Sequence, residues 1–324
     1  MPELRELVCT YVAQRFDLKD YDVASTLITV GASQAIDLAM RAIIDPGDEV
    51  ILPQPTYVAY VPAVLLARGK AVQVPVEACD DFKLRADRVE AAITPRTKAI
   101  LLPFPNNPTG GIMERDDLME IAQVAIKHDL VVISDEIYAE LTYNGKRHVS
   151  IAALPGMRER TLVINGFSKA FSMTGWRLGF AIGPQPLVAA MTKLHQLTML
   201  CAPTTAQVAG IAALKQGLAD GWKDMLYMQG EYEKRRRYMV DALNELGLTC
   251  REPEGAFYTF PSIQSTGLSS EEFCDRLLES AKVVTVPGSA FGEAGEGFIR
   301  CCYATDIEDI KEAMRRIRGF LAAL

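Results

Sequence analysis

Residues 99–135, AILLPFPNNPTGGIMERDDLMEIAQVAIKHDLVVISD, decide the predicted fold. Ala99–Pro103 is a short apolar run that ends in a loop of Pro, Asn and Gly, and Glu114–His128 has the apolar spacing of a helix. Leu130–Ser134 is a second apolar run. Neither run alternates apolar and polar residues, which is typical of strands buried on both faces of a parallel sheet. We therefore interpret this stretch as a strand, a helix and a second strand parallel to the first.

The same rhythm of apolar runs and helical segments extends toward both ends of the chain. Further strands are predicted at Thr26–Val30, Glu49–Leu52, Ala71–Val76, Thr161–Asn165 and Gly179–Ile182. Further helices are predicted at the start of the chain and at Ser33–Ile44, Tyr57–Ala67 and Asp87–Ala92. This alternation predicts an α/β fold, with a mostly parallel sheet covered by helices.

The pattern changes after about residue 204. Helical periodicity continues from Thr205 to Leu246. Short strands and helices alternate after it, at Ala256–Phe260, Ser269–Ala281, Val283–Val286, Phe298–Tyr303 and Asp306–Ala323. We predict a large α/β domain at residues 1–235 and a smaller C-terminal α+β domain at residues 236–324. A cleft between two such domains is the usual place for a ligand.

The composition excludes several classes of partner. The 324 residues include 34 Lys+Arg and 41 Asp+Glu, so the net charge is −7, whereas nucleic acids and anionic membranes select basic surfaces. No apolar run reaches the roughly 18 residues of a membrane span. The first residues, MPELRELVCTYVAQRF, carry charges where a signal peptide has its apolar stretch. We expect a cytoplasmic protein that binds neither nucleic acid nor membrane.

Cysteine and histidine do not form a metal-binding pattern. The seven cysteines include no C-x-x-C pair, and the three histidines are scattered. We therefore expect no disulfide framework and no metal site. Most of the cysteines are expected to be small buried apolar residues.

Small residues at Gly31, Ala32 and Ser33 lie between a predicted strand and a predicted helix. Free N–H groups at the start of a helix suit a phosphate. A tight turn with an N-cap serine is the commoner explanation of such a segment. Asn107 follows a predicted strand, at the edge of an α/β sheet where ligands bind. Asp135 ends a buried strand, so its carboxylate requires a buried cation unless it caps a helix.

The segment NGFSKAFSMTGWRLG, residues 165–179, carries the strongest signal. Lys169 lies between Phe167 and Phe171 in a stretch with few charges, so burial would lower its proton affinity and make it a competent amine nucleophile. A solvated surface position is the ordinary alternative for a lysine. The guanidinium of Arg177 suits a phosphate. Arg300 interrupts an apolar strand, where it binds a carboxylate across the cleft or makes a structural ion pair.

Five segments, in this order, resemble the class I and II aminotransferases: GASQA (31–35), NNPTGG (106–111), SDEIY (134–138), SKAFSMTGWRLG (168–179) and the strand with Arg300. The resemblance covers essentially the whole chain and is closest to the aspartate/aromatic and N-acetyl-diaminopimelate branch. It implies the fold type I of enzymes that depend on pyridoxal 5'-phosphate, and a homodimer with shared active sites. The implied reaction moves an amino group from an L-amino acid to a 2-oxo acid, with glutamate and 2-oxoglutarate as one pair.

The resemblance also implies roles for individual residues. Lys169 would bind the cofactor as a Schiff base and shuttle the substrate's proton, and Asp135 would pair with the protonated pyridine nitrogen. The remaining implied roles are cofactor oxygen binding by Asn107 and Tyr138, ring stacking by Tyr57, phosphate binding by Gly31, Ala32, Ser33 and Arg177, and substrate carboxylate binding by Arg300 and Asn107.

Two departures from the family pattern accompany the resemblance. Family members carry several dozen residues before the helix that opens this chain, including a tyrosine that reaches the phosphate of the neighbouring subunit. We expect either such a segment upstream of this chain or a protein that works without it. Gly166 also stands where many relatives have a phosphate-binding serine.

Two other functions remain open from the sequence. A pyridoxal-phosphate carbon–sulfur β-lyase would use the same lysine, aspartate and arginine. A cofactor-binding module with little turnover is the alternative outside enzymes, although such regulators normally carry a basic DNA-binding domain.

Overall fold

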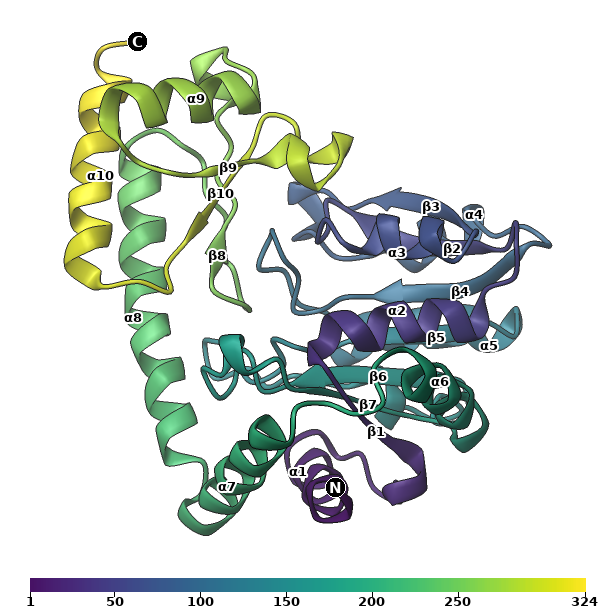
Figure 1. Ribbon diagram of the computed structural model, residues 1–324. Helices are drawn as coiled ribbons and strands as arrows, with labels where there is room; N and C mark the ends of the chain where they lie inside the picture. The colour runs from purple at the N-terminus through teal and green to yellow at the C-terminus, as the bar shows by residue number, and fades with distance from the viewer.

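The structure, a computed structural model, describes residues 1–324 and contains a large and a small sheet (Figure 1). The large sheet consists of β1 (Thr26–Thr29), β2 (Glu49–Gln54), β3 (Lys70–Pro75), β4 (Thr97–Leu102), β5 (Val131–Asp135), β6 (Thr161–Gly166) and β7 (Gly179–Ile182). Its seven strands run in the order β1-β7-β6-β5-β4-β2-β3. Only β7 is antiparallel to its neighbours. The predicted α/β fold with a mostly parallel sheet is thus confirmed.

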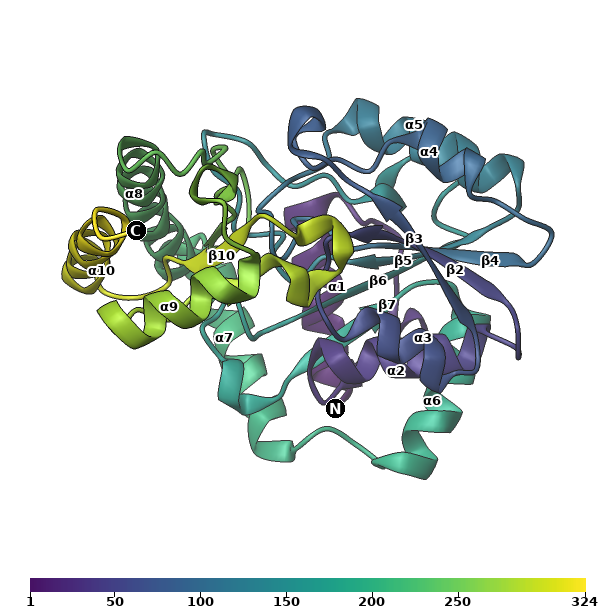
Figure 2. The same cartoon turned by 90° about the horizontal axis from the view of Figure 1, so that it is seen from above.

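Helices cover both faces of this sheet. They are α1 (Pro2–Phe16), α2 (Gly31–Ile43), α3 (Tyr60–Leu66), α4 (Ala86–Ala91), α5 (Arg115–Lys127), α6 (Gln185–Thr198) and α7 (Thr204–Asp220). Helices α4 and α5 lie on one face, and α2, α3 and α6 lie on the other (Figure 2). Helix α1 contacts α7 and β1. None of the helices combines the length and apolar content that crossing a membrane requires.

Strand β2 shows why the apolar runs do not alternate. Ile51 packs into the core cluster under α4 and α5, whereas Val50 and Leu52 pack into the cluster under α2, α3 and α6. All three side chains are fully buried. Because successive side chains of a strand point to opposite faces, a strand between two helical layers needs an apolar residue at every position.

The C-terminal part forms a smaller α+β unit, as predicted. It contains α8 (Lys223–Glu245), β8 (Tyr258–Thr259), α9 (Ser270–Ala281), β9 (Val286–Pro287), β10 (Ile299–Cys302) and α10 (Ile307–Leu321). Its three strands are antiparallel in the order β8-β10-β9. Leu243 of α8, Phe273 of α9 and Ile310 of α10 share one apolar core with Ile299 of β10. The division after residue 235 stays a prediction, and that residue lies inside the unbroken helix α8.

Three expectations about local structure were wrong. The predicted helical stretch from Thr205 to Leu246 is two helices, because Gly221 and Trp222 both adopt left-handed backbone angles, with φ of 71° and 66°. Helix α6 was not predicted. All seven cysteines are free thiols, but only Cys250, Cys274 and Cys301 are buried.

Candidate active site

One edge of the large sheet collects the residues that the sequence singled out. Asp135 ends β5, and Asn107 and Lys169 lie in the loops that follow β4 and β6. Arg177 reaches the same edge from the other direction, because it precedes β7, the one antiparallel strand. The carboxyl ends of parallel strands form the usual ligand-binding edge of an α/β sheet.

A cavity of about 360 Å³ opens at this edge. It is lined by residues of the large-sheet loops together with Tyr258 and Arg300 from the small sheet. The predicted site residues that line it are Ala32, Ser33, Tyr57, Asn107, Asp135, Tyr138, Lys169, Arg177 and Arg300. Gly31 is absent from the lining but lies directly beside Arg177. The structure therefore brings together every residue of the predicted site.

Gly31 and Gly179 shape an anion-binding corner of the cavity. A Cβ at Gly179 would lie 2.5 Å from the carbonyl carbon of Gly31 and 2.6 Å from the nitrogen of Ala32, so glycine lets β7 approach the first turn of α2. A Cβ at Gly31, whose φ is +74°, would lie 2.7 Å from Nη2 of Arg177. The free N–H groups of a helix start and a guanidinium thus meet at one place. This combination favours a phosphate.

Asp135 is a buried carboxylate without a cationic partner in the chain. Its Oδ2 accepts a hydrogen bond of 2.9 Å from the Tyr60 hydroxyl, and its Oδ1 accepts one of 3.1 Å from the backbone N–H of Ile137. Burial raises the pKa of Asp135 to about 6, although the bond from Tyr60 opposes the shift. A protonated ring nitrogen in the cavity would supply the missing positive charge.

Lys169 is half-buried, and two aromatic rings face its ammonium group. Its Nζ lies 5.6 Å from the ring centre of Tyr138 and 5.1 Å from that of Phe257. Burial lowers the pKa of Lys169, and the positive charges of Arg177 and Arg300 lower it further. A lysine with a lowered pKa is neutral, and therefore nucleophilic, at a lower pH.

Arg300 connects the small sheet to the large-sheet loops. Its Nη1 donates a hydrogen bond of 2.9 Å to Oδ1 of Asn107. Its guanidinium carbon lies 4.4 Å from the ring centre of Tyr258 and 4.9 Å from that of Phe291. Its Nε is buried without a hydrogen-bond partner. Because a buried donor without an acceptor is costly, this arginine has unused capacity to bind a carboxylate.

Two tyrosines of the cavity were missed from the sequence. Tyr60 lies three residues after Tyr57. This spacing would place both on one face of the predicted helix Tyr57–Ala67, and it could have indicated Tyr60, although α3 begins only at Tyr60. Tyr258 lies in β8, and its hydroxyl is 3.1 Å from that of Tyr138. No local pattern distinguishes Tyr258 from a core aromatic residue, because its site partners lie far away in the chain.

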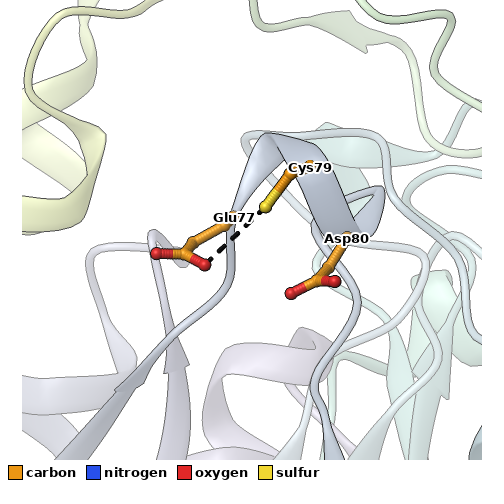
Figure 3. Close-up of side chains that lie close together, drawn as sticks. All are labelled: Glu77, Cys79 and Asp80. Atoms are coloured by element: carbon orange, nitrogen blue, oxygen red, sulfur yellow. Dashed lines mark hydrogen bonds between the residues drawn. The ribbon is translucent and has the colours of Figure 1, made fainter.

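A group of metal-type side chains lies outside this cavity. Glu77, Cys79 and Asp80 come together after β3, and the thiol of Cys79 lies 3.8 Å from Oε2 of Glu77 (Figure 3). Arg88 Nη2 lies 2.6 Å from Glu77 and 3.4 Å from Asp80. The two carboxylates are thus already paired with the guanidinium of Arg88.

Comparison with known proteins places this geometry in context. Residues 1–317 match the family model for aminotransferase class I and II. The chain is 54% identical over 318 residues to YugH of Bacillus subtilis, an aminotransferase by provisional assignment. The alignment covers 98% of this chain and 81% of that protein. It is 44% identical to an aspartate aminotransferase of Pyrococcus abyssi, over 99% of this chain and 82% of the relative. The solved aromatic aminotransferase of Pyrococcus horikoshii superposes with a TM-score of 0.97 at 42% identity, covering 100% of this chain and 86% of that chain.

Proposed function

The chain belongs to the class I and II aminotransferases, and on this premise we propose that it uses pyridoxal 5'-phosphate to move an amino group from an L-amino acid to a 2-oxo acid. Glutamate with 2-oxoglutarate is the proposed first pair. The observation that carries the proposal is the single cavity that contains Lys169, Asp135, Arg177 and Arg300. Asp135, Arg177 and Arg300 offer the charges that different parts of the reactants require, and Lys169 offers an amine nucleophile.

In this proposal each part of the cofactor has a partner in the cavity. The corner formed by Gly31 and Arg177 would hold the phosphate, together with Ala32 and Ser33 at the start of α2. The carboxylate of Asp135, which lacks a cation, would pair with the protonated ring nitrogen. Tyr57, whose ring packs edge-on against that of Tyr60 at 5.5 Å, would lie against the ring of the cofactor.

The substrate and the reacting atoms have their own groups. Lys169 would hold the cofactor covalently through Nζ, and Asn107 and Tyr138 would bind the cofactor's phenolic oxygen. Arg300, with its unpartnered Nε, would bind the α-carboxylate of the amino acid. Asn107 accepts a hydrogen bond from Nη1 of Arg300 and would thus connect the cofactor to the carboxylate-binding residue.

The residues then act in a definite order. The cofactor, when bound, accepts the electron pair that remains after the substrate loses its Cα proton. Asp135 keeps the negative charge that stabilises a protonated ring nitrogen. Nζ of Lys169, once free of the cofactor, would be the neutral amine that takes the proton from the substrate's Cα and later gives it up again. Arg300 fixes the substrate so that its Cα lies near this amine.

We also propose that the chain forms a homodimer with shared active sites. The end of α6 and the connection to α7 expose large apolar side chains, with Leu197 86%, Met199 50% and Leu200 74% exposed. Contiguous exposed apolar side chains mark interaction surfaces. Light scattering after gel filtration tests the proposal, and a strictly monomeric loaded protein would contradict it.

An absorbance spectrum tests the proposed function. Pyridoxal phosphate added to the protein is expected to produce an absorbance band of the lysine-bound cofactor, and glutamate is expected to convert it to that of the aminated cofactor. Release of pyruvate and ammonia from a cysteine derivative, without any 2-oxo acid, would instead identify a carbon–sulfur β-lyase. Failure of the wild-type protein to form the band would overturn the proposal.

A further inference from the structure

Tyr258 lies between two parts of the site that come from different sheets. It belongs to β8 and pairs in register with Cys302 of β10, two residues after Arg300. Its side chain is 7% exposed and lines the cavity. Its position in the small sheet therefore places it beside Arg300 while it faces the loops of the large sheet.

The side chain makes two contacts of different kinds. Its hydroxyl lies 3.1 Å from the hydroxyl of Tyr138, which follows β5 of the large sheet. Its ring lies 4.4 Å from the guanidinium carbon of Arg300. One partner is proposed to bind the cofactor, and the other is proposed to bind the substrate.

The first contact, between the two hydroxyls, concerns the direction in which the Tyr138 hydroxyl points its proton. Each tyrosine hydroxyl has one proton to donate, and the buried hydroxyl of Tyr138 has Tyr258 as its one hydrogen-bond partner. If Tyr258 donates to Tyr138, the proton of Tyr138 is free to point at the phenolic oxygen of the cofactor. A hydroxyl that accepts a hydrogen bond also donates a stronger one.

The second contact, between the ring of Tyr258 and Arg300, concerns the orientation of the guanidinium plane. A guanidinium over the face of an aromatic ring is attracted to it, and its N–H edge stays free for other partners. On this edge of Arg300, Nη1 donates one hydrogen bond to Asn107 and Nε has no partner. The ring of Tyr258 therefore holds the arginine in an orientation in which its donors remain available to a carboxylate.

We propose that Tyr258 is a positioning residue that couples the two halves of the site, its hydroxyl directing the proton of Tyr138 and its ring orienting Arg300. The inference rests on the proposed function. It assigns two separable roles to one side chain, which two substitutions can separate. Tyr258→Phe removes only the hydroxyl, and Tyr258→Leu removes the hydroxyl and the ring.

The first role is tested by titrating the absorbance of the cofactor-loaded protein with pH, without turnover. Tyr258→Phe weakens, but does not remove, the donation from Tyr138 to the cofactor oxygen. The midpoint pH of the cofactor's absorbance change is therefore expected to rise by roughly 0.1–0.6 pH unit, about 10–30% of a hydrogen bond to a charged group. In a Tyr138→Phe background the same substitution is expected to cause no further shift. The matched control is Tyr303→Phe, because Tyr303 is a buried tyrosine of the small unit whose hydroxyl donates to the backbone oxygen of Ala256.

The second role is tested by binding of succinate, a carboxylate that cannot react. Calorimetry is expected to give a Kd within about twofold of wild type for Tyr258→Phe and roughly tenfold weaker for Tyr258→Leu, since only the latter loses the cation–π contact. Thermal unfolding of both variants establishes that they fold.

The two proposals fail in different ways. A wild-type protein that forms no cofactor band overturns the proposed function and this inference with it. A wild-type band whose midpoint does not move in Tyr258→Phe, or a succinate Kd that does not change in Tyr258→Leu, overturns the coupling role and leaves the proposed function intact.

Discussion

The hydroxyl of Tyr60 donates a hydrogen bond of 2.9 Å to Oδ2 of Asp135, so the first residue of α3 neutralises part of the charge at the end of β5. Both side chains are buried. This bond does not fully compensate the carboxylate for its loss of hydration, because burial still raises the pKa of Asp135 to about 6. Asp135 is thus poised for a cation that the chain itself does not provide.

This relationship predicts that Asp135 destabilises the cofactor-free protein at high pH. The folded pKa of about 6 exceeds the unfolded value of 3.8, so the folded state binds more protons and stability falls as pH rises from about 4 to 6. The difference of about 2 units corresponds to roughly 3 kcal/mol at pH 8. Asp135→Asn is therefore expected to stabilise the cofactor-free protein by up to about 3 kcal/mol in urea unfolding at pH 8, and the gain should shrink toward pH 4.

The control for this prediction is Asp129→Asn. The Asp129 side chain is 94% exposed, so this substitution should change stability by less than about 0.5 kcal/mol at either pH. Equal stabilities of Asp135→Asn and wild type at pH 8 would show that the buried carboxylate carries no such penalty. In the loaded protein the order should reverse, since the ion pair with the ring is lost.

Lys169→Ala is expected to abolish the lysine-bound cofactor band and to reduce transamination by at least about 10³-fold, because it removes both the proposed covalent anchor and the proposed proton carrier. The spectrum and the turnover rate are measured on the same sample. Lys193→Ala, an exposed lysine of α6, serves as the control and should leave both unchanged. Full turnover by Lys169→Ala would eliminate the proposed role.

Arg300→Lys is expected to raise the KM for an amino acid about 10- to 150-fold, since a hydrogen bond to a charged group contributes about 1.5–3 kcal/mol. The ammonium keeps the charge but loses the planar edge that Arg300 presents beside Asn107. The same variant should react with an amine that has no carboxylate as well as wild type does. An equal loss for both substrates would place Arg300 outside carboxylate binding.

Gly179→Ala is expected to weaken pyridoxal phosphate binding by at least about tenfold or to destabilise the fold by roughly 1–3 kcal/mol, because the new methyl would meet backbone atoms of Gly31 and Ala32 that cannot rotate away. Fluorescence titration and thermal unfolding measure the two effects. Gly175→Ala has no atom within 4 Å of its new Cβ and is the matched control. Normal behaviour of Gly179→Ala would mean that the close approach of β7 and α2 is dispensable.

Glu140→Gln is expected to destabilise the protein by about 2 kcal/mol, less than for a fully buried pair because Arg15 is 22% exposed. Glu140 accepts hydrogen bonds from the Tyr11 hydroxyl at 2.8 Å and from Arg15 Nε at 2.9 Å, and thereby attaches α1 to the loop after β5. Chemical unfolding measures the loss. Glu3→Gln, which breaks an exposed pair with Lys215, should cost less than about 0.5 kcal/mol.

The sequence by itself determined the parallel sheet and the large-sheet half of the site. Strands buried on both faces are apolar at every position, and this pattern is local, as β4 and β5 illustrate. Asn107, Asp135 and Lys169 follow such strands directly, so the ends of the strands bring them to one edge whatever the details of packing. Their position at one site could therefore be predicted from the residue types and their order.

Only the tertiary structure decided which side chains contact these residues. Tyr60 reaches Asp135 across 75 positions of sequence, and Arg300 reaches Asn107 across 193. In the sequence, Tyr258 resembles any buried aromatic residue of a short strand. In the structure, its ring lies against the guanidinium of Arg300 and its hydroxyl lies next to that of Tyr138. Such contacts arise from the packing of one sheet against another, and residues so far apart leave no periodic signal in the chain.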